Sequence, residues 1–207
     1  MDYIMELTER YPILGGCEAD VWRAIDTLVG MYRAGGKLLL AGNGGSASDC
    51  EHISGEMLKG FMLKREPMIE ELPGLPSETV KQLQRGIGAI PLSSLSSVFT
   101  AFCNDVAPEL TFAQLVFALG QKNDVFMGLS TSGNAKNVCE AAKVAKSMGL
   151  FTMGMTGQGG GALSEICDLT IRVPEKATYR VQELHLPVYH VICAQVEEIL
   201  FGETIES

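Results

Sequence analysis

Two pairs of side chains in this sequence could bind a metal ion or move protons. His52 and Glu56 are four residues apart, so a helix would present both on one face. Gln182 and His190 lie in a second predicted helix near the end of the sequence. Eight residues advance a helix by two turns plus roughly 80°, so spacing permits this pair to meet at one site but does not require it. Imidazole, carboxylate and carboxamide groups together suit metal-assisted or acid–base chemistry.

Two loops rich in glycine and hydroxyl groups could bind an anion. The first is Gly42-Asn43-Gly44-Gly45-Ser46, and the second is Ser130-Thr131-Ser132-Gly133-Asn134. Each follows a predicted strand and opens a predicted helix, where backbone N–H groups lack partners. Three adjacent hydroxyl groups are not needed for a turn, so we expect Ser130, Thr131 and Ser132 to bind phosphate. A third glycine cluster, residues 157–161, is interpreted as a plain turn.

The elements that must position these residues follow a βαβ pattern. Short, almost continuously apolar runs alternate with helical segments, which is typical of a parallel sheet covered on both faces. The predicted strands are Lys37–Ala41, Ala89–Leu92, Asp124–Leu129, Leu150–Met155 and Leu169–Val173. The predicted helices are Ala47–Lys59, Asn134–Met148 and Arg180–Phe201, with a bend expected at Pro187. The carboxyl edge of such a sheet is where ligands bind, so both loops should face the same site.

Two segments lie outside this repeat. Residues 1–35 are interpreted as a helical extension with a break at Gly15 and Gly16. Residues 64–88 are interpreted as an excursion between two strands, because three prolines and Gly74 interrupt them. Within the excursion we expect Ser77 to cap a short helix over Glu78–Arg85.

Composition narrows the class of protein. The chain has 207 residues, 46% of them hydrophobic, and a net charge of −9. The acidic charge and the lack of a basic cluster argue against nucleic-acid binding. No apolar run is long enough for a membrane span and no signal-peptide pattern opens the chain, so we expect a cytoplasmic protein. The six cysteines are scattered, which favours free thiols over disulfides.

A dinucleotide-binding fold is an alternative interpretation of the first loop. Gly42, Gly44 and Ala47 satisfy the pattern Gly-x-Gly-x-x-Ala. However, the acid expected about 20 residues further on is missing, and Phe61, Lys64 and Arg65 occupy that region. A nicotinamide-dependent oxidoreductase is therefore the third choice.

The ordered set of motifs resembles the bacterial phosphoheptose isomerases. It comprises the first loop with His52-x-x-x-Glu56, then Asn104-Asp105, the Ser-Thr-Ser-Gly-Asn loop, Thr156-Gly157, and Gln182-Glu183-x-His185 with His190. The resemblance covers about residues 36–200. It implies a single sugar-isomerase (SIS) domain over residues 36–207, preceded by the extension at 1–35. The implied architecture is a five-stranded parallel sheet flanked by helices, a flavodoxin-like three-layer sandwich.

The resemblance also implies the roles of individual residues. One zinc ion per subunit would be bound by His52, Glu56, Gln182 and His190, although this ligand set also suits other divalent metals. Ser130, Thr131 and Ser132 would hold the phosphate, while Asn43, Ser46, Asp105 and Gln182 would approach the sugar. Glu56 and His190 would transfer protons. The family is typically a homotetramer with active sites at subunit contacts.

The implied reaction interconverts sedoheptulose 7-phosphate and D-glycero-D-manno-heptose 7-phosphate through an enediol or enediolate. The alternative is a non-catalytic SIS module that binds a phosphosugar or a replication-initiation protein. That branch lacks the acid at position 56 and the histidine at position 190, whereas this chain keeps both. The chain departs from the common pattern at Ala135, where a serine is usual, at Tyr179, and in the length of the excursion at 64–88.

Overall fold

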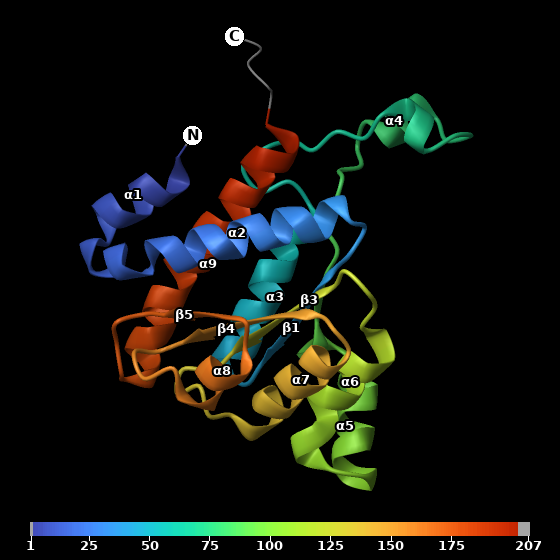
Figure 1. Ribbon diagram of the computed structural model, residues 1–207. Coiled ribbons are helices and arrows are strands. Elements are labelled where there is room, and N and C mark those ends of the chain that lie inside the picture. Colours follow the sequence, from blue (N-terminus) through green and yellow to red (C-terminus); the bar gives the residue numbers. More distant parts are fainter. Residues whose placement is uncertain (1, 203–207) are drawn as a thin grey trace.

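The fold is a three-layer α/β sandwich built on one parallel sheet (Figure 1). The computed structural model describes residues 2–202 of the chain, so residues 203–207 of the predicted SIS domain lie outside it. The strands are β1 (Leu38–Gly42), β2 (Ala89–Pro91), β3 (Val125–Leu129), β4 (Phe151–Thr156) and β5 (Leu169–Arg172). Their order is β2-β1-β3-β4-β5, and every pair is parallel. This confirms the flavodoxin-like sheet and all five predicted strands, to within one residue at each end.

Helices cover both faces of the sheet (Figure 1). One face carries α1 (Tyr3–Arg10), α2 (Glu18–Arg33), α3 (Gly45–Leu58) and α9 (Thr178–Phe201). The other carries α5 (Ser96–Asp105), α6 (Thr111–Leu119), α7 (Lys136–Ser147) and α8 (Gly161–Ile166). Two apolar cores result, one on each side of the sheet. The strands are almost wholly buried because both of their faces are covered.

The amino-terminal extension is helical, as predicted, and the break between its two α-helices includes Gly15 and Gly16. Asp2 caps α1 by accepting hydrogen bonds from the N–H groups of Ile4 and Met5. Helix α1 ends at Arg10, and a 3-10 segment (Pro12–Cys17) that contains both glycines leads into α2. The side chains of α1 and α2 join the same core as α9, so the extension packs onto the domain.

The excursion between β1 and β2 contains less helix than predicted. Helix α4 spans only Ser77–Val80, and Ser77 is its first residue without a side-chain capping bond, so the predicted helix over 78–85 was wrong. Val80 is the only buried residue of α4, and one apolar contact is too little to stabilise a longer helix. The segment around α4 projects from the body of the molecule (Figure 1).

Helices α5, α6 and α8 were not predicted. Helix α6 is apolar on nearly all sides and therefore lacks the periodicity that marks an amphipathic helix. The last helix, α9, continues through Pro187. No helix in residues 2–202 is long and apolar enough to cross a membrane. All six cysteines are free thiols, as expected.

Candidate active site

Helices α3 and α9 bring three of the predicted functional side chains together. His52 Nε2 lies 3.2 Å from Glu56 Oε1 on the same helix, which confirms the predicted i, i+4 pairing. His190 comes from α9, and its Nε2 lies 3.3 Å from His52 Nε2. Glu56 also accepts a hydrogen bond of 3.1 Å from Lys59 Nζ. Burial lowers the pKa of His190, His52 lowers it further, and Glu56 opposes the change. A carboxylate and two imidazoles therefore meet at one point.

The separations between these atoms suit a tetrahedral metal ion. Zn–N bonds of about 2.0–2.1 Å at tetrahedral angles place two ligand atoms about 3.3 Å apart. The two contacts of His52 have this length, and both imidazoles reach them through Nε2. As they stand, the His, Cys, Asp and Glu side chains of residues 2–202 form no complete group of three metal ligands. The nitrogen and oxygen donors are of the kind that zinc binds, and further ligands would have to complete the set.

The Gln182 side chain comes from α9 and lies against Gly45, the first residue of α3. A β-carbon at Gly45 would collide with the Gln182 carboxamide, so a side chain at this position would have to displace that carboxamide. Ser46, the next residue, is buried at the start of α3. The structure therefore places Gln182 on α9 against the first glycine-rich loop, about two turns of α3 before His52 and Glu56.

The two predicted loops are neighbours because β1 and β3 pair in register. Gly42 is paired with Leu129, so both strands end at the same edge of the sheet. Asn43 and Asn137 exchange two amide hydrogen bonds of 2.9 Å each, which tie the first loop to α7. Asn137 was not predicted from the sequence. Its position relative to the other motifs does not distinguish it from its neighbours in the first turn of α7.

The Ser-Thr-Ser loop opens α7 and is held from behind by the third glycine cluster. Thr131 O accepts from the Gly157 N–H, and the Asn134 side chain accepts from the Ala162 N–H. Gly133 has a φ of 68° and packs against Gly160, where a side chain would clash. Ser130 is buried, while Ser132 is exposed and accepts from the Asn134 N–H. The turn at 157–161 thus supports the backbone of the second loop.

Asp105 is a predicted site residue that lies on α5. It is the last residue of α5 and accepts a hydrogen bond from its neighbour Asn104. Among the described residues, it makes no hydrogen bond or ion pair with either loop.

A buried ion pair fixes the segment that follows α3. Arg65 and Glu197 have no exposed side-chain surface and approach to 2.6 Å. Glu197 also accepts from the N–H groups of Phe61, Met62 and Leu63, and Arg65 donates to the carbonyls of Glu56 and Met57. Burial opposes ionisation of Glu197, but the N–H donors and Arg65 outweigh it and lower its pKa. The pair joins the end of α3, where Glu56 lies, to α9.

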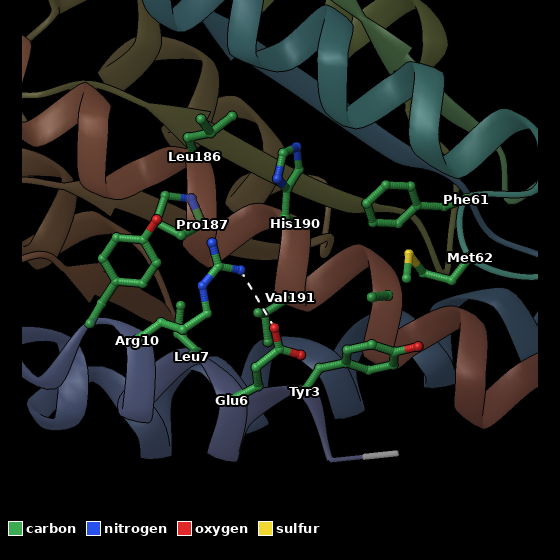
Figure 2. A pocket seen from close by; sticks show the side chains of 12 residues that line it. Tyr3, Glu6, Leu7, Arg10, Phe61, Met62, Leu186, Pro187, His190 and Val191 are labelled. Carbon is green, nitrogen blue, oxygen red and sulfur yellow. Dashed lines mark hydrogen bonds and ion pairs between the residues drawn. The ribbon is translucent and has the colours of Figure 1, made fainter.

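A pocket of about 320 Å³ opens beside His190 (Figure 2). Phe61 packs against the His190 ring with centroids 5.7 Å apart, and α1 supplies the opposite wall with Glu6 and Arg10. The residues of the Ser-Thr-Ser loop do not line this pocket. The pocket therefore lies between α1, α9 and the segment that follows α3, and it does not include the predicted phosphate-binding loop.

The sequence analysis missed the residues that support the cluster. Tyr189 contacts His52, and Arg65 pairs with Glu197, but neither contact follows from spacing along the chain. A usable signal did exist for Glu197, because it falls on the otherwise apolar face of α9 and an acid there requires a buried partner.

The sheet order and the hydroxyl-rich loop at its carboxyl edge define the class of protein, and residues 97–197 match the SIS domain family. The chain is 43% identical to phosphoheptose isomerase 2 of Campylobacter jejuni over 172 residues, which cover 83% of this chain and 76% of that protein. It is 40% identical to the phosphoheptose isomerase of Aneurinibacillus thermoaerophilus, covering 86% and 80% of the two chains. Among solved structures, phosphoheptose isomerase GmhA from Neisseria gonorrhoeae has a TM-score of 0.74 at 28% identity, covering 94% and 93%.

The chain belongs to the phosphoheptose isomerase family, as its motifs predicted. It is a phosphosugar isomerase, and the comparisons favour this enzyme over the non-catalytic SIS module.

Proposed function

We propose that this isomerase converts sedoheptulose 7-phosphate to D-glycero-D-manno-heptose 7-phosphate. The names of its relatives support a seven-carbon sugar phosphate as substrate. The observation that carries the proposal is the meeting of Glu56, His52 and His190 on two helices of a fold whose hydroxyl-rich loop lies at the carboxyl edge of the sheet. Such a site can hold a phosphate at one end and move a proton at the other.

The phosphate would lie at the start of α7. Ser130, Thr131 and Ser132 supply hydroxyl donors there, and the first N–H groups of this 12-residue helix lack helical partners. These donors provide local positive potential in a chain of net charge −9. Asn43, which is held by Asn137, and Ser46 would bind sugar hydroxyl groups. Asp105 would also approach the sugar, as the family resemblance implies.

Proton transfer is assigned to Glu56 and His190. One base removes a proton from C1 of the open-chain ketose and a proton is returned to C2, while O1 loses a proton and O2 gains one. The Glu56 carboxylate is shielded, with 15% of its side chain exposed, and Lys59 contacts one of its oxygens. His190 lies across from it on α9, where it can exchange a proton with a substrate oxygen.

A zinc ion held by His52, Glu56, Gln182 and His190 would polarise the carbonyl and stabilise the negative charge that develops on the sugar oxygens. The paired separations around His52 support this assignment, and the nitrogen and oxygen donors also suit other divalent metals. The role of Gln182 as a ligand rests on the family resemblance, and its carboxamide lies against Gly45 at the start of α3.

We also infer a cytoplasmic homotetramer with sites at subunit contacts. Large apolar side chains beside the site support an interface, because Met62 and Leu186 are 56% and 40% exposed at the rim of the pocket. Nothing in composition or charge suggests a nucleic-acid or membrane partner.

The test is isomerisation of sedoheptulose 7-phosphate by purified protein, followed by NMR with zinc, with a chelator, and after zinc is restored. We expect zinc-dependent formation of the aldose. Glu56→Gln should reduce turnover at least about 100-fold, because general-base catalysis contributes roughly 10²–10⁴. Glu51→Gln, an exposed acid on the same helix, is the matched control and should keep full activity.

Turnover by Glu56→Gln at the wild-type rate would show that another residue is the base. No turnover by folded, zinc-loaded wild type would exclude this substrate, and other phosphosugars would be tried.

A further inference from the structure

A pair of side-chain amides joins the first glycine-rich loop to the helix that follows the second loop. Asn43 belongs to the first loop, and Asn137 lies in the first turn of α7. Asn43 Nδ2 donates to Asn137 Oδ1 at 2.9 Å, and Asn137 Nδ2 donates back to Asn43 Oδ1 at 2.9 Å. The two residues are 94 positions apart in the sequence, so this contact exists only in the folded protein.

A backbone group fixes which way round the two amides lie. If both amides were turned over, so that oxygen and NH₂ group changed places, the pair alone would keep both of its hydrogen bonds. However, the Val138 N–H donates to Asn137 Oδ1 at 3.0 Å, and a backbone N–H can only donate. A turned Asn137 amide would place its NH₂ group against this donor. The Asn137 oxygen therefore faces Val138, and the Asn43 NH₂ group faces that same oxygen.

This arrangement leaves Asn43 with one donor and one acceptor for a ligand. An asparagine NH₂ group has two hydrogens and its oxygen has two lone pairs, and Asn137 occupies one of each. Asn43 is exposed, so the second hydrogen and the second lone pair are accessible. A sugar hydroxyl group can both accept and donate, so it is a suitable partner for such an amide.

We propose that Asn137 is a positioning residue that holds the Asn43 carboxamide in one orientation for a hydroxyl group of the sugar. The binding of sugar by Asn43 is part of the proposed function, and the purpose of the amide pair rests on it. The orientation of the pair does not, because it follows from contacts within the protein. A side chain that is already held in its binding geometry loses less freedom when the ligand binds. The pair should therefore favour binding of the sugar and leave binding of phosphate unchanged.

The first experiment tests the amide pair without any substrate. The side-chain NH₂ signals are recorded by NMR in ¹⁵N-labelled protein, and Asn43→Ala identifies the signals of Asn43 by their loss. In Asn137→Ala we expect these signals to shift and their hydrogens to exchange faster with water than in wild type. Glu140→Gln, which changes a partly exposed acid one turn further along α7, is the matched control and should leave the Asn43 signals as in wild type. Unchanged Asn43 signals and exchange in Asn137→Ala would overturn the proposal.

The second experiment compares kcat/KM for sedoheptulose 7-phosphate with the dissociation constant of inorganic phosphate. One hydrogen bond between uncharged groups corresponds to a factor of about 2–10, so kcat/KM should fall by about this factor in Asn137→Ala. Phosphate binding should stay as in wild type, and Glu140→Gln should change neither quantity. Parallel loss of kcat/KM and phosphate binding in Asn137→Ala would show that Asn137 only supports the structure of α7. An unchanged kcat/KM would show that it positions nothing.

A double variant shows whether Asn137 acts through Asn43. If its only role is to orient that carboxamide, Asn137→Ala should have no further effect on kcat/KM once Asn43 is replaced by alanine. The single and double variants therefore form a cycle in which the two losses are far from multiplicative. Losses that multiply would contradict the proposal, because they would show that the two residues act independently.

These experiments separate failure of this proposal from failure of the proposed function. If wild type does not isomerise the substrate, the assignment of this sugar is wrong, while the NMR measurement still decides whether Asn137 orients Asn43. If wild type isomerises the substrate, but Asn137→Ala leaves the Asn43 signals and kcat/KM unchanged, only the role of Asn137 is wrong.

Discussion

Replacing Glu197 with glutamine should destabilise the protein by about 3–5 kcal/mol, the usual cost of breaking a buried ion pair. Glu197 accepts four hydrogen bonds, with Phe61 N–H and Arg65 on one oxygen and Met62 and Leu63 N–H on the other. A glutamine has one acceptor oxygen, so its NH₂ group would face two donors in either orientation. Two unsatisfied donors cost about 2–6 kcal/mol at roughly 1–3 kcal/mol each, which agrees with the first figure.

The assay is urea unfolding of the metal-free protein at pH 7.5 and one fixed protein concentration. Trp22 is the only tryptophan, and it packs against the core that contains α9, so its fluorescence should report the transition. The fixed concentration matters because assembly would stabilise the folded state by mass action. Typical stabilities are about 5–15 kcal/mol, so the expected loss is a large and measurable fraction.

Two further variants test the reasoning. Glu140→Gln removes an exposed partner of Lys143 and should cost less than about 1 kcal/mol. Adding Arg65→Met to Glu197→Gln removes the uncompensated buried charge, so the double variant should lose less stability than the sum of the two single variants. A loss below about 1 kcal/mol in Glu197→Gln, or a strictly additive double variant, would refute the argument that this pair is coupled.

Two further changes probe the buried histidine and the close approach of the helices. Burial lowers the pKa of His185 from 6.5 to about 4. Between these two pH values the unfolded protein therefore binds more protons than the folded protein does. As a result, the stability that His185 contributes is fully present above pH 6.5 and is lost as the pH falls toward 4. His185 should therefore account for about 2–3 kcal/mol of the stability lost between pH 7.5 and 4.5, and urea unfolding of His185→Leu should show a correspondingly smaller loss; an equal pH dependence in the two proteins would contradict this. Gly45→Ala should displace the Gln182 carboxamide and weaken zinc binding, whereas Gly55→Ala, at an open position on the same helix, should bind zinc as wild type does; a competition titration with a chelator measures both.

Local pattern in the sequence determined the elements and the placement of motifs on them. Continuous apolar runs identified the five strands, because a strand buried on both faces has little room for polar residues. Spacing alone predicted the contact between His52 and Glu56, since i, i+4 residues share a helix face. Parallel strand order then placed both loops at one edge of the sheet. The family resemblance added residue roles that spacing does not contain.

Only the tertiary structure decided which distant residues meet. His190 reaches His52 across 138 residues of sequence, because the sheet and the packing of α9 on α3 set that distance. The contact of Tyr189 with His52 and the pairing of Arg65 with Glu197 likewise appear only in the folded structure. Periodicity describes contacts within one helix or strand, whereas contacts between elements depend on how all their buried faces fit together. The sequence by itself therefore predicted the candidate ligands and both loops, and the fold determined which side chains support them.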